Sequence, residues 1–383
     1  MSSARSAWLL HAVTWTVLTG ACSPADQAAP PQSVGERLSG DASGYRKVTR
    51  PGMFRFPADH GPHPEYKHEW WYLTGQVENA DGRRFGFQFT IFREAISPRP
   101  VQSASRWATN QIYLAHVAVT DVAGKRYLSD ERYARGALEL AGASAEPFRV
   151  WLEDWELSGA PGREGELATR VVAAGEQFGF DLEIRNARPP VAHGDRGLSA
   201  KGAEDNASYY YSYTRLEAEG AIRIDGESFH VNGSAWFDHE WSSSVLQAHQ
   251  AGWDWFSLQL SNGIDLMAFR LRHKTDSERD FYNGTVVDPS GGTTVLSSGQ
   301  IDMQAREYWT SDRTGVRYPT HWRLSVPDLG LELFTEPLLH DQEFAHSFRY
   351  WEGAVRVRGR HDGEPVEGRG YLELAGYAAN GQR

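Results

Sequence analysis

The feature that most constrains the fold of this chain is a long-range repeat in its sequence. The segment EGAIRI at 219–224 matches EGAVRV at 352–357, and GSAWF at 233–237 aligns with GRGYL at 368–372. A Gly-Glu pair lies between the two matched segments in each copy. Because the matches recur in the same order, the sequence indicates one architectural unit that is present twice.

Each copy also begins in a similar way. WYL at 71–73, followed by an Asp81-Gly82 turn, resembles WFSL at 255–258, followed by an Asn262-Gly263 turn. Asp-Gly and Asn-Gly are strong signals for tight hairpin turns. Each copy is therefore expected to open on a Trp-rich hairpin and to close on a strand with a Gly-x-aromatic pattern.

Much of the remaining sequence has the residue pattern of β-strands. Residues 72–77 and 85–92 alternate between apolar and polar side chains on the two sides of a turn. The same character appears in four other segments, 112–122, 150–157, 179–184 and 221–231. One short helix is expected over 242–250. Many short strands separated by turns predict an all-β sandwich or barrel. With the repeat, this predicts two tandem antiparallel β-barrels, residues 51–241 and 242–383, with the seam just after Trp241.

Composition limits the classes of partner. The 383 residues carry a formal net charge of -11, which argues against nucleic acid because phosphate binding needs concentrated Lys and Arg. The 14 Trp, 16 Tyr and 17 Phe favour cores and apolar pockets. With a single cysteine, Cys22, the chain has no internal disulfide and no thiolate metal site. We expect a monomer that binds a hydrophobic small molecule.

The N-terminus has the layout of an export signal. Arg5 precedes a mostly apolar run over 7–18, and Thr19-Gly20-Ala21 provides small residues before Cys22. A Cys after Gly-Ala resembles a bacterial lipobox, in which Cys22 is lipidated; the alternative is an ordinary secretory peptide with an incidental Cys. Residues 1–22 are therefore expected to be a signal peptide and 23–50 a flexible tether. The expected location is the bacterial cell envelope, with membrane attachment only through the lipid at Cys22.

The segment WFDHEW at 236–241 is the strongest candidate for a functional site. It places Asp238, His239 and Glu240 between indole rings. Strand alternation puts Asp238 and Glu240 on one face and His239 and Trp241 on the other. A proton donor beside aromatic rings suits the protonation of an alkene, because the rings attract the resulting cation by very roughly 0.5–2 kcal/mol. The catalytic candidates are His239, Trp241 and Asp238, the last as an acid if burial raises its pKa.

A structural role for the same segment stays open. The run could be a hydrogen-bonded latch between domains, in which Asp238 orients His239 or pairs with an arginine. Neighbouring side chains on a strand diverge, so Asp238, His239 and Glu240 cannot bind one metal ion together. No metal is expected. No zinc, nucleotide, dinucleotide or serine-hydrolase motif is present in the sequence, and no cofactor is expected.

Other residues are candidates for binding a ligand. Glu69 and Trp70 belong to a second His-Glu-Trp triplet at 68–70, although a Trp at this position can also close the floor of a barrel. Tyr209, Tyr211 and Tyr213 share one face of a strand and either line a pocket or hydrogen-bond across a core. The substrate-binding set is completed by two further residues, Glu240 and Trp253.

Seven segments together resemble a known family. They are HEWWYLTG (68–75), RRFGFQFTIFR (83–93), ASYYYSYTRL (207–216), SAWFDHEW (234–241), GWDWFSLQL (252–260), THWRLSVP (320–327) and YWEGAVRV (350–357). In this order they look like the AttH/CrtC group, whose members are described as carotenoid 1,2-hydratases or secreted hydrolases. The resemblance implies two lipocalin-like β-barrels. It also implies that the pair His239 and Trp241 belongs to a catalytic region, since the characterised branch adds water across a terminal double bond of an acyclic carotenoid.

The chain departs from that branch in one respect. A further carboxylic acid is expected on a strand downstream of His-x-Trp, but residues 266–271 contain Arg270 and no acid, and only Asp254 and Asp265 lie nearby. Two hypotheses remain. The first is a secreted protein that binds an isoprenoid or acyl molecule and catalyses acid-assisted hydration. The second is a non-catalytic carrier or envelope-stress protein with the motif as an interdomain latch. A hydrolase activity has no nucleophile motif to support it.

Overall fold

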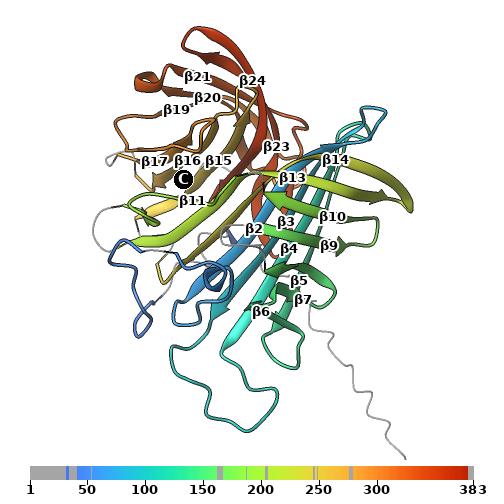
Figure 1. Ribbon diagram of the computed structural model, residues 1–383, viewed down its shortest axis with the longest axis vertical. Coiled ribbons are helices and arrows are strands. Elements are labelled where there is room, and N and C mark those ends of the chain that lie inside the picture. Colours follow the sequence, from blue (N-terminus) through green and yellow to red (C-terminus); the bar gives the residue numbers. More distant parts are fainter. Residues whose placement is uncertain are drawn as a thin grey trace, which may run out of the picture. The chain divides into compact units, whose positions relative to one another are not determined.

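The computed structural model describes residues 32–33, 41–52, 54–161, 167–186, 188–202, 206–244, 246–247, 249–275 and 279–377. The expected signal segment, including Cys22, lies outside the described residues. In the described part of the chain, no helix combines the length and the apolar character needed to cross a membrane. The all-β prediction is confirmed: strands dominate and form two large, mainly antiparallel sheets (Figure 1).

The first sheet contains 13 strands, with a main path in the order β5-β4-β3-β2-β14-β13-β10-β9-β8-β7-β6. Two short strands, β11 and β12, pair with β13 off this path. The bounds are β2 (His68–Glu78), β3 (Arg84–Ala95), β4 (Gln111–Asp121), β5 (Arg126–Arg135), β6 (Ala141–Ala145), β7 (Phe148–Leu152), β8 (Trp155–Pro161), β9 (Leu167–Ala174), β10 (Phe178–Asn186), β11 (Val191–Ala192), β12 (Leu198–Ala200), β13 (Ala207–Ile224) and β14 (Glu227–Ser242).

The second sheet contains 11 strands, with the order β18-β17-β16-β15-β24-β23-β21-β20-β19. Off this path, β22 pairs with β23, and β1 (Gln32–Ser33) pairs with β23 in parallel. The other bounds are β15 (Gln250–Leu260), β16 (Asp265–His273), β17 (Phe281–Val287), β18 (Thr293–Leu296), β19 (Asp302–Thr310), β20 (Arg317–Val326), β21 (Leu331–Pro337), β22 (Glu343–Ala345), β23 (Phe348–His361) and β24 (Glu364–Ala375). Two 3-10 helices complete the described elements, η1 (Ala58–His60) and η2 (Pro327–Leu329).

The two strand orders show the duplicated unit. In each sheet a four-stranded meander, β2–β5 or β15–β18, is joined through its first strand to the last strand of the unit, β14 or β24. The preceding strand, β13 or β23, then leads to the remaining strands. Figure 1 shows β2 beside β14 in the first sheet and β15 near β24 in the second. Between the sheets, the chain passes from Ser242 to Gln250.

The sequence alignment of the two copies agrees with the structure on the last strand of each unit, β14 and β24. On the preceding strands, β13 and β23, the aligned residues do not occupy equivalent positions. Gly233 and Gly368 occupy corresponding positions opposite β2 and β15. The two EGA segments, in contrast, lie at different distances from their hairpin turns. Gly220 therefore corresponds to Gly359 and not to Gly353. At Gly220 and Gly359 a Cβ would meet a backbone oxygen of the adjacent strand at 2.2 and 2.0 Å, so close strand approach requires glycine at both.

Each sheet encloses its own apolar core. The first core includes the fully buried Trp71 and Trp155, and the second includes Trp322 and Trp351. The first sheet curls until β7 contacts β3, β4 and β5 across this core. Such curling is the usual way in which a long twisted sheet covers its apolar face.

A third apolar cluster joins the outer faces of the two sheets. It contains Trp236 and Tyr72 from the first sheet and Trp255 and Tyr371 from the second. Trp236 and Tyr371 hold corresponding places in the repeat. The two sheets therefore meet through equivalent surfaces, as in a two-fold symmetric dimer.

Two glutamines at equivalent positions fasten this interface. Gln76 on β2 donates from Nε2 to two backbone carbonyls of β23 and β24, at 2.9 and 2.8 Å. Gln259 on β15 donates in the same way to two carbonyls of the first sheet, on β13 and β14, at 2.8 and 2.9 Å. Both amides are buried, so these bonds are formed without competition from bulk water.

Two expectations about connecting segments differ from the structure. Within the expected tether, residues 41–50 are ordered, and Val48 is buried in the first core. The helix expected over 242–250 is wrong, because the described residues there form bends and a turn. Side-chain hydrogen bonds, such as the one from the Gln247 backbone N–H to Gln250 Oε1 at 2.8 Å, satisfy the backbone in place of helical bonds.

Candidate active site

Strand β14 presents the WFDHEW segment to two different environments. In register, Asp238 lies between Tyr72 on β2 and Ser212 on β13, and Glu240 lies between Trp70 and Tyr210. Asp238 and Glu240 point toward the second sheet, whereas His239 and Trp241 point into the first core. Strand alternation alone predicts this division.

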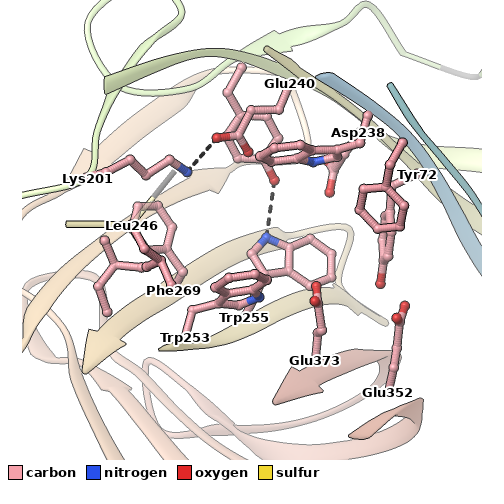
Figure 2. Close-up of a pocket in the computed structure, with 14 residues that line it drawn as sticks. Tyr72, Lys201, Asp238, Glu240, Leu246, Trp253, Trp255, Phe269, Glu352 and Glu373 are labelled. Carbon is pink, nitrogen blue, oxygen red and sulfur yellow. Dashed lines mark hydrogen bonds and ion pairs between the residues drawn. The ribbon is translucent and has the colours of Figure 1, made fainter. Parts of the chain in front are cut away.

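The outward face borders a cavity between the two sheets, which we call the acid chamber. Its volume is about 80 Å³. This volume counts the space open to the centre of a water-sized sphere, of which one water molecule needs roughly 10–15 Å³. The chamber therefore has room for several waters or for one small group of a larger ligand. Figure 2 shows side chains from both sheets pointing into the chamber. They are Trp70, Tyr72, Phe92, Lys201, Tyr210, Asp238, Glu240, Leu246, Trp253, Trp255, Phe269, Leu271, Glu352 and Glu373.

Asp238 is a buried carboxylic acid in the wall of the chamber. Burial raises its pKa to about 7, against hydrogen bonds from Ser212 and Trp236 that favour the anion. The Ser212 hydroxyl and the Trp236 indole both donate to Oδ1, the indole at 2.7 Å. Two donors on Oδ1 leave Oδ2 to carry the proton. Asp238 is therefore an acid that is largely protonated below neutral pH and whose anion already has two donors in place.

Two more carboxyl groups enter the chamber from the second sheet. Burial raises the pKa of Glu373 to about 8, and burial followed by the neighbouring Glu373 carboxyl raises the pKa of Glu352 well above its ordinary value. Glu373 occupies the position on β24 that Asp238 occupies on β14. Figure 2 shows Glu373 and Glu352 reaching from the second sheet toward Asp238 and Tyr72. The duplication thus brings together three acids that favour their neutral form.

Aromatic side chains form most of the other walls. Trp255 packs edge-on against Tyr72, with ring centroids 5.3 Å apart, and donates from Nε1 to the Tyr210 hydroxyl at 3.2 Å. Trp70 and Trp253 are half-buried. A positive charge that developed in the chamber would meet several ring faces, each worth roughly 0.5–2 kcal/mol.

A fixed ion pair lies on one side of the chamber. Lys201 Nζ is 2.8 Å from Glu240 Oε1 and lies over the ring of Phe269, 4.4 Å from its centroid. Because Glu240 is paired with Lys201, its carboxylate is occupied by a cation. We assign Glu240 to holding Lys201 at the chamber wall, whereas the other three carboxyl groups remain available for proton transfer.

His239 belongs to a separate buried network on the inner face. Its Nε2 is 3.0 Å from Glu69 Oε1, and its Nδ1 is 3.0 Å from the Asp59 carbonyl oxygen. Glu69 also accepts from Arg93 Nε at 2.7 Å and contacts His63 Nδ1 at 2.7 Å. Burial alone would raise the pKa of Glu69, but Arg93 and the two histidines hold it well below its ordinary value.

His63, Glu69 and His239 could in principle hold a metal ion, because one ligand atom from each lies within 4.8 Å of the others. Two histidines and a glutamate are a known zinc ligand set. Here Glu69 Oε1 lies within hydrogen-bond distance of both histidines and its second oxygen accepts from Arg93. With no ion bound, burial opposes protonation of His63, but hydrogen bonds to Asp59 and Glu69 raise its pKa to about 9, so the three side chains are held together by hydrogen bonds. The set works as a hydrogen-bonded clamp.

The structure separates the residues that the sequence grouped together. Four of them line the acid chamber: Asp238, Glu240, Trp70 and Trp253. The other six lie on the inner face of the first sheet or against its core: His239, Trp241, Glu69, Tyr209, Tyr211 and Tyr213. The proposed cooperation of His239 with Asp238 has no geometric basis, because neighbours on a strand face opposite ways.

The sequence did not identify the partner acids. Asp254 and Asp265, the carboxylates nearest in sequence, are paired with arginines and do not line the chamber. Glu373 and Glu352 lie much further along the chain. The sequence did contain two signals for this chamber. The repeat aligns Glu373 with Asp238, and strand alternation places Tyr210 on the face opposite Tyr209, Tyr211 and Tyr213.

Comparisons with known proteins agree with this architecture. An AttH protein from Nitrosomonas europaea has 34% sequence identity and a TM-score of 0.77, with 87% of this chain and 99% of that chain covered. Kievitone hydratase from Nectria haematococca shares the fold at 14% identity and a TM-score of 0.67, covering 92% of this chain and 99% of that chain. CghA, solved with Sch210972, shares the fold at 15% identity and a TM-score of 0.50, covering 81% and 88%.

A search of curated proteins found no match. The family model described as AttH-like matches residues 47–377. This match spans both sheets apart from β1, and it includes every residue of the acid chamber. The chain therefore belongs to the AttH-like family.

Proposed function

We propose that this protein binds an apolar, unsaturated small molecule in the acid chamber and adds water across a carbon–carbon double bond. The observation that carries the proposal is the meeting of three buried carboxyl groups with raised pKa values inside an aromatic cavity. Structural carboxylates are normally paired with cations, as Asp254 and Asp265 are here. Neutral acids that border a cavity are instead typical of proton-transfer sites.

The reaction needs one proton donor and one water. Asp238 transfers the proton on Oδ2 to one alkene carbon, which forms a C–H bond and leaves a cation on the adjacent carbon. Trp255, Tyr72 and the other rings stabilise that cation through their π faces. Water then bonds to the cationic carbon and gives a proton to the Asp238 carboxylate, which restores the acid, so that the net reaction is alkene plus water to alcohol.

Each acid has a part in this scheme. Asp238 is the donor, because its Oδ1 is already held by Ser212 and Trp236 and its anion is stabilised as it forms. Glu373, at the equivalent position of the second sheet, is itself neutral, so the proton released by water returns to the Asp238 carboxylate. The Oε1 of Glu352 completes no hydrogen bond with the described residues, so it is free to orient the water.

A likeness in fold supports the type of chemistry. One structural neighbour is named as a hydratase, and at 14% identity it supports the scaffold and not the substrate. The requirement that the ligand be apolar comes from the chamber itself, where aromatic and aliphatic side chains make up most of the wall.

A second candidate is a carrier that binds the same class of molecule without turnover. The residues of the WFDHEW segment that face the first core, His239 and Trp241, favour the carrier. Both ring nitrogens of His239 are already engaged, by Glu69 and by the Asp59 carbonyl. That half of the motif is fully explained by a structural clamp within the first sheet. The carrier is distinguished from the enzyme by the absence of a product.

The test is incubation of the purified protein with an acyclic isoprenoid that has a terminal trisubstituted double bond. In D2O, the enzyme is expected to yield an alcohol, detected by mass spectrometry, with one deuterium bound to carbon. Asp238→Asn should lower the rate at least about 100-fold, in line with the loss of a general acid. Asp181→Asn removes a half-buried carboxylate that lies outside the chamber and is paired with Arg170, and it is the matched control. Binding without product would support the carrier instead.

We also propose export and lipidation at Cys22 on the basis of the N-terminal sequence. Radiolabelled palmitate should be incorporated into the wild-type chain and not into Cys22→Ser when both are expressed in bacteria. Equal labelling of the two chains would remove the lipoprotein proposal, and would leave the chemistry of the chamber untouched.

A further inference from the structure

A second cavity adjoins the acid chamber along the same face of the first sheet. Its volume is about 30 Å³, and its lining includes His68, Ile112, Leu114 and Phe348. Two half-buried side chains, Trp70 and Phe92, line both cavities. The two spaces therefore share these two rings as a common wall.

His68 is the unusual residue of this second cavity. Its side chain is 1% exposed, yet neither Nδ1 nor Nε2 has a hydrogen-bond partner among the described residues. A buried polar group without a partner destabilises the fold, so such groups are rare unless something outside the protein completes them.

The other polar groups of the cavity are already engaged. His116 contacts the Tyr350 hydroxyl at 2.8 Å and Glu131 Oε2 at 3.1 Å. Glu69 and Arg93 are paired with each other, and Glu94 also has a partner. Of the described polar groups that line this cavity, the His68 ring is the one left to recognise a ligand.

Burial lowers the pKa of His68 to about 3, so the imidazole is neutral. A neutral imidazole offers one N–H donor and one nitrogen acceptor. That combination matches a hydroxyl group, which needs both, or a carbonyl oxygen, which needs the donor. It does not match a carboxylate or a phosphate, for which the cavity has no free cation among the described residues.

The geometry of β2 sets the distance between the two compartments. His68, Trp70 and Tyr72 alternate along one face of the strand. At about 3.4 Å per residue, His68 lies on the order of 13–14 Å from Tyr72. Trp70 lies between them on the same face, so the apolar body of an elongated ligand that reaches both cavities would run along its indole.

We propose that the cavity at His68 is a second binding compartment, which takes a hydroxyl or carbonyl oxygen at one end of an elongated apolar ligand while the reacting double bond lies in the acid chamber. The proposal rests on the proposed function, because it assumes that the chamber holds the other end. It makes His68 a residue that determines specificity and not a catalytic one.

The experiment compares three probes that share a carbon skeleton: farnesol, farnesal and the hydrocarbon farnesene. Dissociation constants are measured by calorimetry for the full chain. Wild type is expected to bind farnesol and farnesal about 2- to 12-fold more tightly than farnesene, since one hydrogen bond to a buried group contributes roughly 0.5–1.5 kcal/mol. His68→Phe should remove the preference and keep farnesene binding, whereas His68→Gln, which retains a donor and an acceptor, should keep the preference.

The outcomes separate the two proposals. Equal affinities for all three probes in wild type would overturn the role of His68 and leave the chamber function standing. No binding of any probe would overturn both. If His68→Phe does not fold, the wild-type ratio and the His68→Gln variant still decide, and loss of the preference in His68→Gln would also count against the role of His68.

Discussion

Replacing Asp238 by asparagine should slow turnover at least about 100-fold and stabilise the protein at alkaline pH. Asparagine has nearly the same shape, and its Oδ1 can accept the same hydrogen bonds from Ser212 and Trp236. It cannot ionise. The folded protein is thereby relieved of the requirement to keep a carboxyl group neutral in a buried position.

The magnitude follows from the shift in pKa. The pKa of Asp238 moves from 3.8 to about 7 on folding, a rise of about three units. At about 1.4 kcal/mol per pKa unit, ionisation of Asp238 in the unfolded chain lowers the free energy of unfolding by up to about 4 kcal/mol. Because the folded pKa is raised, this loss begins as the pH rises above about 4, grows until about pH 7, and is constant beyond it.

The assay is urea unfolding of wild type and Asp238→Asn at pH 4 and at pH 8. The gain in unfolding free energy of the variant at pH 8, minus its gain at pH 4, should approach 4 kcal/mol. Other carboxyl groups titrate in both proteins, and their effects largely cancel in this difference. A value near zero would refute the reasoning, because Asp238 would then ionise as readily in the folded chain as in the unfolded one.

Three further outcomes are expected. Hydration should decline as the pH rises through about 7 to 8, because the carboxyl groups of the chamber lose their protons there; a rate that rises over this range, measured with a neutral substrate, would exclude a carboxylic acid as donor. Glu69→Gln should destabilise the fold by about 3–5 kcal/mol in urea unfolding, since it leaves the buried Arg93 without its anion; a change below about 1 kcal/mol would show that the inner network is not a clamp. Gln76→Ala and Gln259→Ala should each cost about 1–3 kcal/mol, because each removes two buried hydrogen bonds; strongly unequal losses would argue against the equivalence of the two halves.

Local patterns were sufficient to predict the fold class. The turn signals at Asp81-Gly82 and Asn262-Gly263 lie in hairpins between long strands. Alternation along β14 also separated Asp238 from His239 correctly. These features depend on neighbours in sequence, because a strand places successive side chains on opposite faces whatever surrounds it. The helix expected over 242–250 failed because side-chain hydrogen bonds there compete with the backbone pattern of a helix.

The candidate site was predicted less well. The sequence selected His239 because histidine often moves protons, but the structure encloses it with Glu69 inside the first core. It also left Glu352 and Glu373 outside the site, since they are distant from Asp238 along the chain. Which face of β14 borders a cavity depends on how the first sheet curls and on what covers its outer side, and neither is encoded in the alternation of one strand.

The sequence by itself determined the strands, the duplicated unit and the division of the WFDHEW segment between two faces, because these follow from side-chain period and turn chemistry within short segments. The tertiary structure alone decided that the outer faces of the two units meet. That contact buries Asp238 beside Glu373 and Glu352, removes the three carboxyl groups from bulk water and raises their pKa values. Desolvation depends on the whole surroundings of a group, and only the packed chain supplies those surroundings.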